Sequence, residues 1–310
     1  MVRVRVPATT ANLGPGFDTL GLALNLNNYV EIESQDDSRN GKESQLSCEV
    51  LVENQDLRIE IDSQDNLILK TLRKLSAYTG EKLSGVDITE RLATRPALGL
   101  GSSAVAIVGT LLAANEYFQL GLSQTELRQL ACQLEGHPDN VMAALEGGLT
   151  VSTYSEAKNM PVWEKIEPHE SLESVVIIPE LTSKTEEQRS VVPESFVRDD
   201  LIFNLGRTAL LPLAINRGRT EKLKELMQDK MHQPYRCPQI PGWEEIKKAG
   251  YEAGALGIAL SGAGPTIFVL TQNRAKNIGQ AMCECWEKRN IESRYYLASL
   301  DNKGAHIVGK

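Results

Sequence analysis

The feature that most constrains this 310-residue chain is a glycine- and serine-rich turn that opens directly into an apolar segment with helical spacing. The turn reads Gly99-Leu100-Gly101-Ser102-Ser103. Glycines let the backbone turn tightly and bring its N–H groups close to an anion, and the serines offer a helix cap and spare hydroxyls. Because a helix N-terminus carries a partial positive charge, the segment predicts a phosphate-binding cradle before a helix over residues 102–118. A tight loop before an ordinary core helix is the alternative.

The turn differs from two widespread phosphate-binding sequences. A P-loop needs a lysine after its glycines, and none follows here. A GxGxxG turn needs a third glycine, and the corresponding residue is Ala104. The segment therefore predicts phosphate binding of another kind.

Composition excludes several classes of partner. The net charge of −8 and the pI near 5.3 argue against nucleic acid and acidic membrane surfaces as main partners. No apolar run reaches 18 residues, so no membrane-spanning helix is expected. The five cysteines are odd in number and scattered in spacing, which favours reduced thiols in a cytoplasmic protein. A small-molecule partner fits these limits.

Strand and helix signals are mixed along the whole chain. The first half predicts strands over residues 2–6, 29–33, 48–52, 57–61, 86–92 and 149–151. It predicts helices over residues 66–78, 102–118, 123–135 and 138–147, with a capping box at Ser123 and Glu126. The second half predicts a strand over 174–178, three or four helices, a hairpin-like pair over 256–261 and 266–270, a helix over 275–288 and a strand over 293–298. We therefore expect two α+β domains, residues 1–160 and 161–310.

Two polar segments offer side chains for chemistry. Residues 7–18 place Asn12 and Asp18 on a glycine-proline loop after a strand, where a scaffold would hold them; capping of their own backbone is the alternative. Residues 135–140 join the carboxylate of Glu135 to Asp139 in the first turn of the next helix. Such a pair suits Mg²⁺ and a substrate hydroxyl, although an acidic residue there also complements a helix dipole.

Two further polar segments and a small-residue turn complete the candidates. Arg189 and Arg236, in residues 183–189 and 232–236, are suited to binding a planar carboxylate through paired hydrogen bonds. A surface salt bridge is the alternative for either arginine. Residues 260–266 are small enough to let a ligand or another loop approach, and an ordinary hairpin turn is the alternative there.

The order of these segments resembles that of the GHMP kinase superfamily, and within it the homoserine kinases, over essentially the whole chain. Residues 7–18, 96–104 and 260–266 correspond in order to the three superfamily motifs. Between them stand Glu-Gly-His-Pro-Asp-Asn and His-Gln-Pro-Tyr-Arg. The resemblance implies a two-domain GHMP kinase fold of the α+β class. Its N-terminal domain would be similar to domain 2 of ribosomal protein S5 and its C-terminal domain ferredoxin-like. It also implies ATP and Mg²⁺ as cofactors and a homodimer.

The resemblance also implies which residues bind ATP and Mg²⁺. The phosphates would lie on the glycine-serine turn, the adenine beside Asn66, and Mg²⁺ beside Ser103 and Glu135. The full set of implied ATP-binding positions is Asn66, Pro96, Leu98, Gly99, Leu100, Gly101, Ser102, Ser103, Gly262 and Gly264. Leu98 departs from the family pattern, because relatives often carry a polar residue there; a local effect is expected.

A second implied set binds the phosphoryl acceptor. Asn12 would contact the reacting hydroxyl, and Asp18 would bind the substrate ammonium. Arg189 and Arg236 would bind the carboxylate. Thr185, His137 and Asp139 would complete the pocket. An amino acid substrate needs an anion for its ammonium, guanidinium groups for its carboxylate and a neutral group at its hydroxyl. Phosphoryl transfer itself requires mainly positioning and charge neutralisation.

Comparison with other members of the superfamily sharpens the expected substrate. The loop over residues 7–12 has no lysine of the kind that mevalonate kinases use, and the Gly-Glu-His of galactokinases is missing near the N-terminus. We therefore expect ATP-dependent phosphorylation of the L-homoserine side-chain hydroxyl, by direct transfer without a strong general base. Asp139 as a base stays open. Rival hypotheses are a kinase for another hydroxy acid such as shikimate, which would leave Asp18 without a partner, and a non-catalytic regulator.

Overall fold

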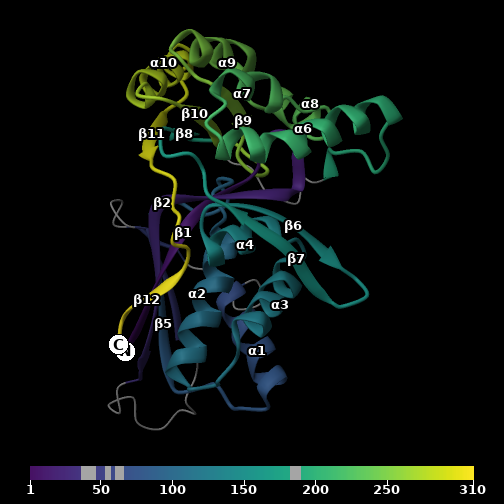
Figure 1. Cartoon of the computed structure of the whole chain (residues 1–310). Coiled ribbons are helices and arrows are strands. Elements are labelled where there is room, and N and C mark those ends of the chain that lie inside the picture. Colours follow the sequence, from purple (N-terminus) through teal and green to yellow (C-terminus); the bar gives the residue numbers. More distant parts are fainter. Residues whose placement is uncertain (36–46, 53–56, 60–65, 182–189) are drawn as a thin grey trace.

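The computed structural model describes residues 1–35, 47–52, 57–59, 66–181 and 190–310. Two sheets, each covered by helices, lie one above the other in Figure 1. The strand order of the first sheet is β12-β1-β2-β5-β3-β4, with the β6–β7 hairpin attached through β2. Its strands are β1 (Val2–Asn12), β2 (Gly16–Ser34), β3 (Ser47–Val52), β4 (Leu57–Ile59), β5 (Val86–Leu92), β6 (Leu149–Ser155), β7 (Met160–Ile166) and β12 (His306–Gly309). The helices of this half are α1 (Leu67–Thr79), α2 (Ser102–Tyr117), α3 (Gln124–Glu135) and α4 (Asp139–Glu146).

The second sheet is antiparallel, in the order β11-β8-β10-β9. Its strands are β8 (Glu173–Pro179), β9 (Gly257–Leu260), β10 (Ile267–Thr271) and β11 (Ser293–Ala298). The helices of this half are α6 (Arg198–Asn216), α7 (Thr220–Leu226), α8 (Gln233–Arg236), α9 (Trp243–Glu252) and α10 (Ala275–Glu287), with the 3-10 helix η1 (Cys237–Gln239) after α8. The predicted α+β class is confirmed, and the predicted 256–270 hairpin is present as the β9–β10 pair.

Helix α2 is buried on nearly all sides, as its apolar composition requires. Residues from Ala104 to Leu111 are all buried, and the helix packs between the first sheet and α1, α3 and α4. Gly109 permits its closest approach, because a Cβ atom there would overlap the side chain of Val30 on β2. The helix N-terminus is thereby held in a fixed place beside β1.

The first predicted polar loop, residues 7–18, is mostly strand. Strand β1 continues to Asn12 and β2 begins at Gly16, so only Leu13, Gly14 and Pro15 form the turn. The small and β-branched residues of positions 8–11 are buried and pair with β2, which explains the extension. Asn12 and Asp18 therefore stand on two strand ends and not on a loop.

The end of the chain returns to the first sheet. Strand β12 pairs antiparallel with β1, and the two termini lie side by side in Figure 1. The predicted limit at residue 160 falls at the start of β7, which pairs with β6 in the first sheet. The division into residues 1–160 and 161–310 stays a prediction.

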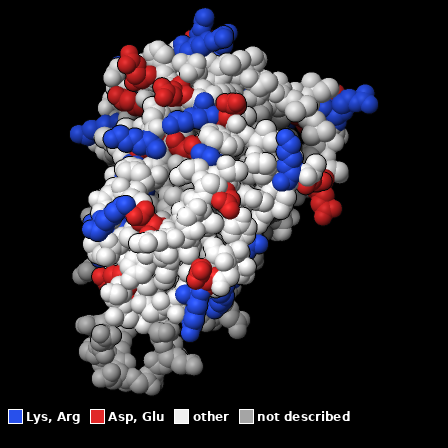
Figure 2. All heavy atoms as spheres, turned by 60° about the horizontal axis from the view of Figure 1, so that its bottom comes forward, with Lys and Arg blue, Asp and Glu red and all other residues white. Residues whose placement is uncertain are grey.

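One buried apolar cluster spans the two halves. Leu13, Leu22 and Leu100 from the first half pack in the same buried cluster as Leu226 and Phe268 from the second. On the face shown in Figure 2, basic and acidic side chains are interspersed. Among the described helices, none has the length and apolar character needed to cross a membrane.

Candidate active site

Three segments far apart in the sequence meet where the two halves join. The N–H of Gly262 donates to Ala11 O at 3.2 Å, and the N–H of Thr266 donates to Leu98 O at 3.4 Å. The hydroxyl of Ser261 lies 2.5 Å from Gly99 O and 2.9 Å from Thr10 Oγ1. The end of β1, the glycine-serine turn and the β9–β10 turn therefore form one hydrogen-bonded unit.

The glycine-serine turn leaves the N-terminus of α2 open. The N-cap is Gly101, with φ of 70° and no capping side chain, so the prediction that a serine caps this helix is wrong. Ser102 and Ser103 are the first two helical residues, and the hydroxyl of Ser102 accepts from the N–H of Ala97. A glycine cap brings no side chain into the space in front of the helix, and the free N–H groups there suit a phosphate.

Gly99 is needed for this turn on two counts. Its φ is 83°, and a Cβ atom would overlap the backbone oxygen of Ser261. We expect Gly99→Ala to lower the free energy of unfolding by about 3 kcal/mol, since a left-handed residue costs about 1 kcal/mol and the overlap adds more. Gly80→Ala is the matched control, because Gly80 has φ of 77° and open space around it. Urea denaturation measures both variants; equal losses would contradict the proposed overlap.

Ser103 and Glu135 meet at the mouth of the turn. The hydroxyl of Ser103 donates to Glu135 Oε1 at 2.6 Å, and His137 Nε2 lies 3.8 Å from the same oxygen. Glu135 is the last residue of α3, and Gly136, with φ of 88°, ends that helix. A hydroxyl and a carboxylate beside a phosphate cradle are the hard oxygen ligands that Mg²⁺ prefers. The residues present therefore fit the ion.

Asn12 and Asp18 are held in left-handed backbone conformations. Their φ values are 73° and 52°, which are uncommon for residues other than glycine and concentrate at functional sites. Asn12 Oδ1 accepts from the N–H of Asp18 at 3.0 Å, and Asn12 Nδ2 donates to Gly262 O at 3.0 Å. One possible ligand atom each from Asp18, His137 and Asp139 lie within 4.8 Å of one another. The side chains predicted to bind the acceptor thus converge.

Arg236 brings a positive charge to this site. It is only 2% exposed, and its Nη1 donates to Gly262 O at 3.2 Å. Its guanidinium carbon lies 5.3 Å from the centre of the Phe17 ring. A nearly buried guanidinium placed beside the ends of β1 and β2 is suited to binding a carboxylate.

His232 positions Arg236, a role that the sequence analysis did not assign. Burial lowers the pKa of His232 and outweighs the charge of Asp229, which raises it; the charge of Arg236 lowers it further. The ring is therefore neutral: Nε2 donates to Gly14 O at 2.8 Å, which leaves Nδ1 to accept from Arg236 Nη1 at 3.3 Å. Asp229 in turn accepts from the first N–H groups before and within α8, including those of His232 and Gln233. The four-residue spacing of His232 and Arg236 is the signal that could have revealed this pair.

The remaining predicted residues are placed as follows. Asn66 and Pro96 line an adjoining cavity, and Asn66 also caps α1 by accepting from the N–H of Leu69. Leu98 and Leu100 pack into the shared core behind the turn, and the oxygen of Leu100 accepts from the N–H of Thr9. The N–H of Gly264 donates to Ser261 O. Thr185 and Arg189 lie outside the described residues.

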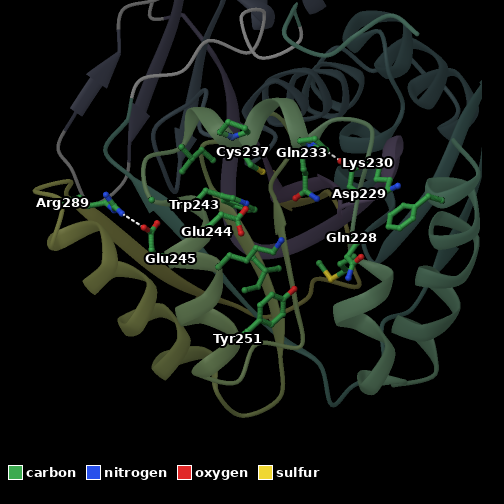
Figure 3. A pocket seen from close by; sticks show the side chains of 18 residues that line it. Gln228, Asp229, Lys230, Gln233, Cys237, Trp243, Glu244, Glu245, Tyr251 and Arg289 are labelled. Carbon is green, nitrogen blue, oxygen red and sulfur yellow. Dashed lines mark hydrogen bonds and ion pairs between the residues drawn. The ribbon is translucent and has the colours of Figure 1, made fainter. Parts of the chain in front are cut away.

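A large pocket of about 890 Å³ lies elsewhere, beside η1 and α9, and Gln233 of α8 is part of its lining (Figure 3). Its lining includes Cys237, Trp243 and Tyr251 and none of the predicted site residues. Two of its charged groups are already paired within the protein: Arg289 with Glu245 at 2.9 Å, and Lys230 with Asp200 at 3.0 Å. The smaller pocket at the glycine-serine turn, lined by Asn12, Ser103, Glu135, Asp139, Arg236 and their neighbours, is the one that gathers the reactive groups.

Comparison with known proteins identifies the family of the chain. Residues 66–148 match the GHMP kinases N-terminal domain, and residues 213–288 match the GHMP kinases C-terminal domain. Homoserine kinase of Halothermothrix orenii is 38% identical over 309 residues, covering 100% of this chain and 97% of its own, and that of Desulfitobacterium hafniense is also 38% identical, covering 99% and 100%. The crystal structure of homoserine kinase from Cytophaga hutchinsonii superimposes with a TM-score of 0.86 at 28% identity, covering 99% of this chain and 97% of that one. The chain belongs to the homoserine kinase family of the GHMP kinases.

Proposed function

We propose that this protein transfers the terminal phosphoryl group of ATP to the side-chain hydroxyl of L-homoserine, giving O-phospho-L-homoserine. The observation that carries the proposal is one pocket with two halves, a phosphate cradle at α2 and an amino-acid site with Asp18 and Arg236. Asp18 would bind the substrate ammonium and Arg236 its carboxylate. Asn12, between them, would bind the hydroxyl that reacts.

The cradle half supports ATP as the donor. The uncapped N–H groups of α2 would bind phosphate oxygens, and Ser103 with Glu135 would hold Mg²⁺. When bound, Mg²⁺ supplies positive charge that neutralises the phosphates. Preorganised donors and charges of this kind supply most of the catalysis in phosphoryl transfer.

Asp139 supports direct transfer without a strong base. It is 2% exposed, and its Oδ1 lies 2.6 Å from His137 Nδ1 and accepts from the N–H of Asn140 at 2.7 Å. We propose that Asp139 uses Oδ1 to orient His137 and the start of α4. The proton of the acceptor hydroxyl would leave late, to a phosphate oxygen.

Asp139→Asn is therefore expected to lower kcat by less than about tenfold, because the amide keeps an oxygen at the start of α4. Steady-state kinetics at saturating ATP and homoserine measure the effect, and thermal denaturation of the same sample shows whether the variant is folded. A folded variant with a loss of about ten-thousandfold would establish Asp139 as a general base and contradict direct transfer.

The proposal as a whole is tested by ADP release with homoserine, shikimate, mevalonate and galactose as acceptors. We expect turnover with homoserine and at most traces with the other three, which lack an ammonium for Asp18. Turnover with shikimate alone would support the rival hydroxy-acid kinase. ATP binding without turnover of any acceptor would support a non-catalytic role, although Asn12, Ser103 and Glu135 are all present.

We also propose that two copies pair through α6 and that the enzyme works in the cytoplasm. The exposed side of α6 carries Ile202, Leu205 and Leu210, each more than half exposed, and apolar patches of this kind mark interaction surfaces. Light scattering that gives the mass of a single chain would contradict the pairing.

All five cysteines, which lie in the described part of the chain, are free thiols. Free thiols are expected in a reducing compartment such as the cytoplasm.

A further inference from the structure

Helix α6 presents two polar side chains to the interior of the protein. Asn204 is 2% exposed and Thr208 is partly buried. Residues four apart lie side by side on a helix, so the two share one face of α6. A buried amide needs partners for both of its N–H groups and for its oxygen. The partners of Asn204 therefore show what this face of the helix holds.

Both side chains bind the turn between β1 and β2. Asn204 Nδ2 donates to Pro15 O at 3.1 Å, and Thr208 Oγ1 donates to the same oxygen at 2.8 Å. A carbonyl oxygen has two lone pairs, and these two donors use both of them. The turn is therefore fixed to α6 between the strand ends that carry Asn12 and Asp18.

Asn204 also binds the segment that leads into α8. Its Nδ2 donates to Asp229 Oδ1 at 2.6 Å, and its Oδ1 accepts from the N–H of Lys230 at 3.0 Å. The buried carboxylate of Asp229 accepts in addition from the three backbone N–H groups of residues 231–233, and so determines how α8 begins. The last residue of this short helix is Arg236. One amide thus joins the β1–β2 turn to the start of the helix that carries the arginine.

We propose that Asn204 and Thr208 are positioning residues of the acceptor site. They hold the turn beside Asp18 in place against the helix that carries Arg236, and these two groups are assigned to the ammonium and the carboxylate of one substrate. Neither Asn204 nor Thr208 is among the residues that line the pocket, so each acts through the backbone that it binds. A misplacement of about 1 Å caused far from the chemistry can cost about a hundredfold in rate. The inference rests on the proposed function in that homoserine is taken as the acceptor.

The first test replaces Asn204 with alanine and measures steady-state kinetics of the full chain. The KM for homoserine should rise about tenfold or more, because the turn and the start of α8 both lose a hydrogen-bond partner. The KM for ATP should stay nearly unchanged, because the phosphate cradle belongs to α2. Asn115→Ala is the matched control: that amide joins the far end of α2 to the backbone of Leu122. A KM for homoserine no higher in Asn204→Ala than in this control would overturn the proposal.

Two variants of Thr208 separate its hydroxyl from its shape. Thr208→Ser keeps the hydroxyl, so its KM for homoserine should be close to that of the wild type. Thr208→Val keeps the shape but has no donor for Pro15 O, and should raise this KM about threefold. Both changes are small, so they test the proposal even where Asn204→Ala does not fold. A role in packing alone would give the reverse order, with the valine variant nearer to the wild type, and would overturn the proposal.

Amide hydrogen exchange of the free protein tests the same contacts without any substrate. Asn204→Ala should speed exchange in residues 12–18 and 230–236, whereas Thr208→Val should speed it only in residues 12–18. Unchanged exchange in both segments of Asn204→Ala would overturn the proposal. If the variants exchange as expected but the wild type does not phosphorylate homoserine, the proposed function fails and the anchoring of the turn stands.

Discussion

Replacing Glu135 with glutamine is expected to lower kcat about a thousandfold, with the KM for homoserine changed only a few-fold. The Glu135 carboxylate accepts a hydrogen bond from the Ser103 hydroxyl at 2.6 Å. Glutamine keeps the shape and one oxygen but loses the charge that would hold Mg²⁺ against the phosphates. Losses of this size follow from removing one preorganised electrostatic group at a reacting centre.

The measurement is kcat as a function of Mg²⁺ concentration. Glu135→Gln should need far more Mg²⁺ for half-maximal activity. Ser103→Ala is the matched control: it removes the hydroxyl but keeps the carboxylate, and should show a smaller shift in the same direction. A Glu135→Gln enzyme with normal Mg²⁺ dependence would show that the carboxylate does not act through the ion.

Arg236→Leu is expected to raise the KM for homoserine by about a hundredfold or more, with the KM for ATP nearly unchanged. The guanidinium is buried, and loss of a desolvated charged partner for a carboxylate costs about 3 kcal/mol. Arg236 stands on α8, on the acceptor side of the pocket, whereas the phosphate cradle belongs to α2. The substitution should therefore change the KM for homoserine and leave the KM for ATP nearly unchanged.

Arg236→Lys separates charge from geometry. Lysine keeps the positive charge but cannot form the paired hydrogen bonds of a guanidinium, so its KM for homoserine should lie between those of the wild type and Arg236→Leu. Both variants lose hydrogen bonds to His232 and Gly262. Thermal denaturation measures how much stability each variant loses with them. Equal weakening of ATP and homoserine binding would contradict the assignment to the substrate carboxylate.

Local signals in the sequence predicted much of the fold. The capping box at Ser123 and Glu126 is present in the structure with both of its hydrogen bonds. The β9–β10 hairpin follows from two apolar runs around a glycine-rich turn. In these cases the residues that determine the structure are neighbours in the chain, so their pattern is visible without knowledge of the rest.

Other features depend on contacts that no local pattern reveals. The predicted polar loop over residues 7–18 is wrong because β2 and the core cover residues 8–11, and strand β12 was not predicted because its partner is at the opposite end of the chain. The role of His232 depends on Gly14, 218 residues away. The meeting of Asn12, Glu135 and Arg236 was expected only through family resemblance, and the roles of the individual residues stay predictions.

The pairing of β12 with β1 separates the order of synthesis from the order of folding. Strand β1 is made long before residues 306–309, yet these residues are its neighbours on the side away from β2. A nascent chain therefore carries β1 with one open edge until residues 306–309 have left the ribosome, and open edges invite pairing with other chains. The first sheet of this protein can be completed only after both of its halves have been made.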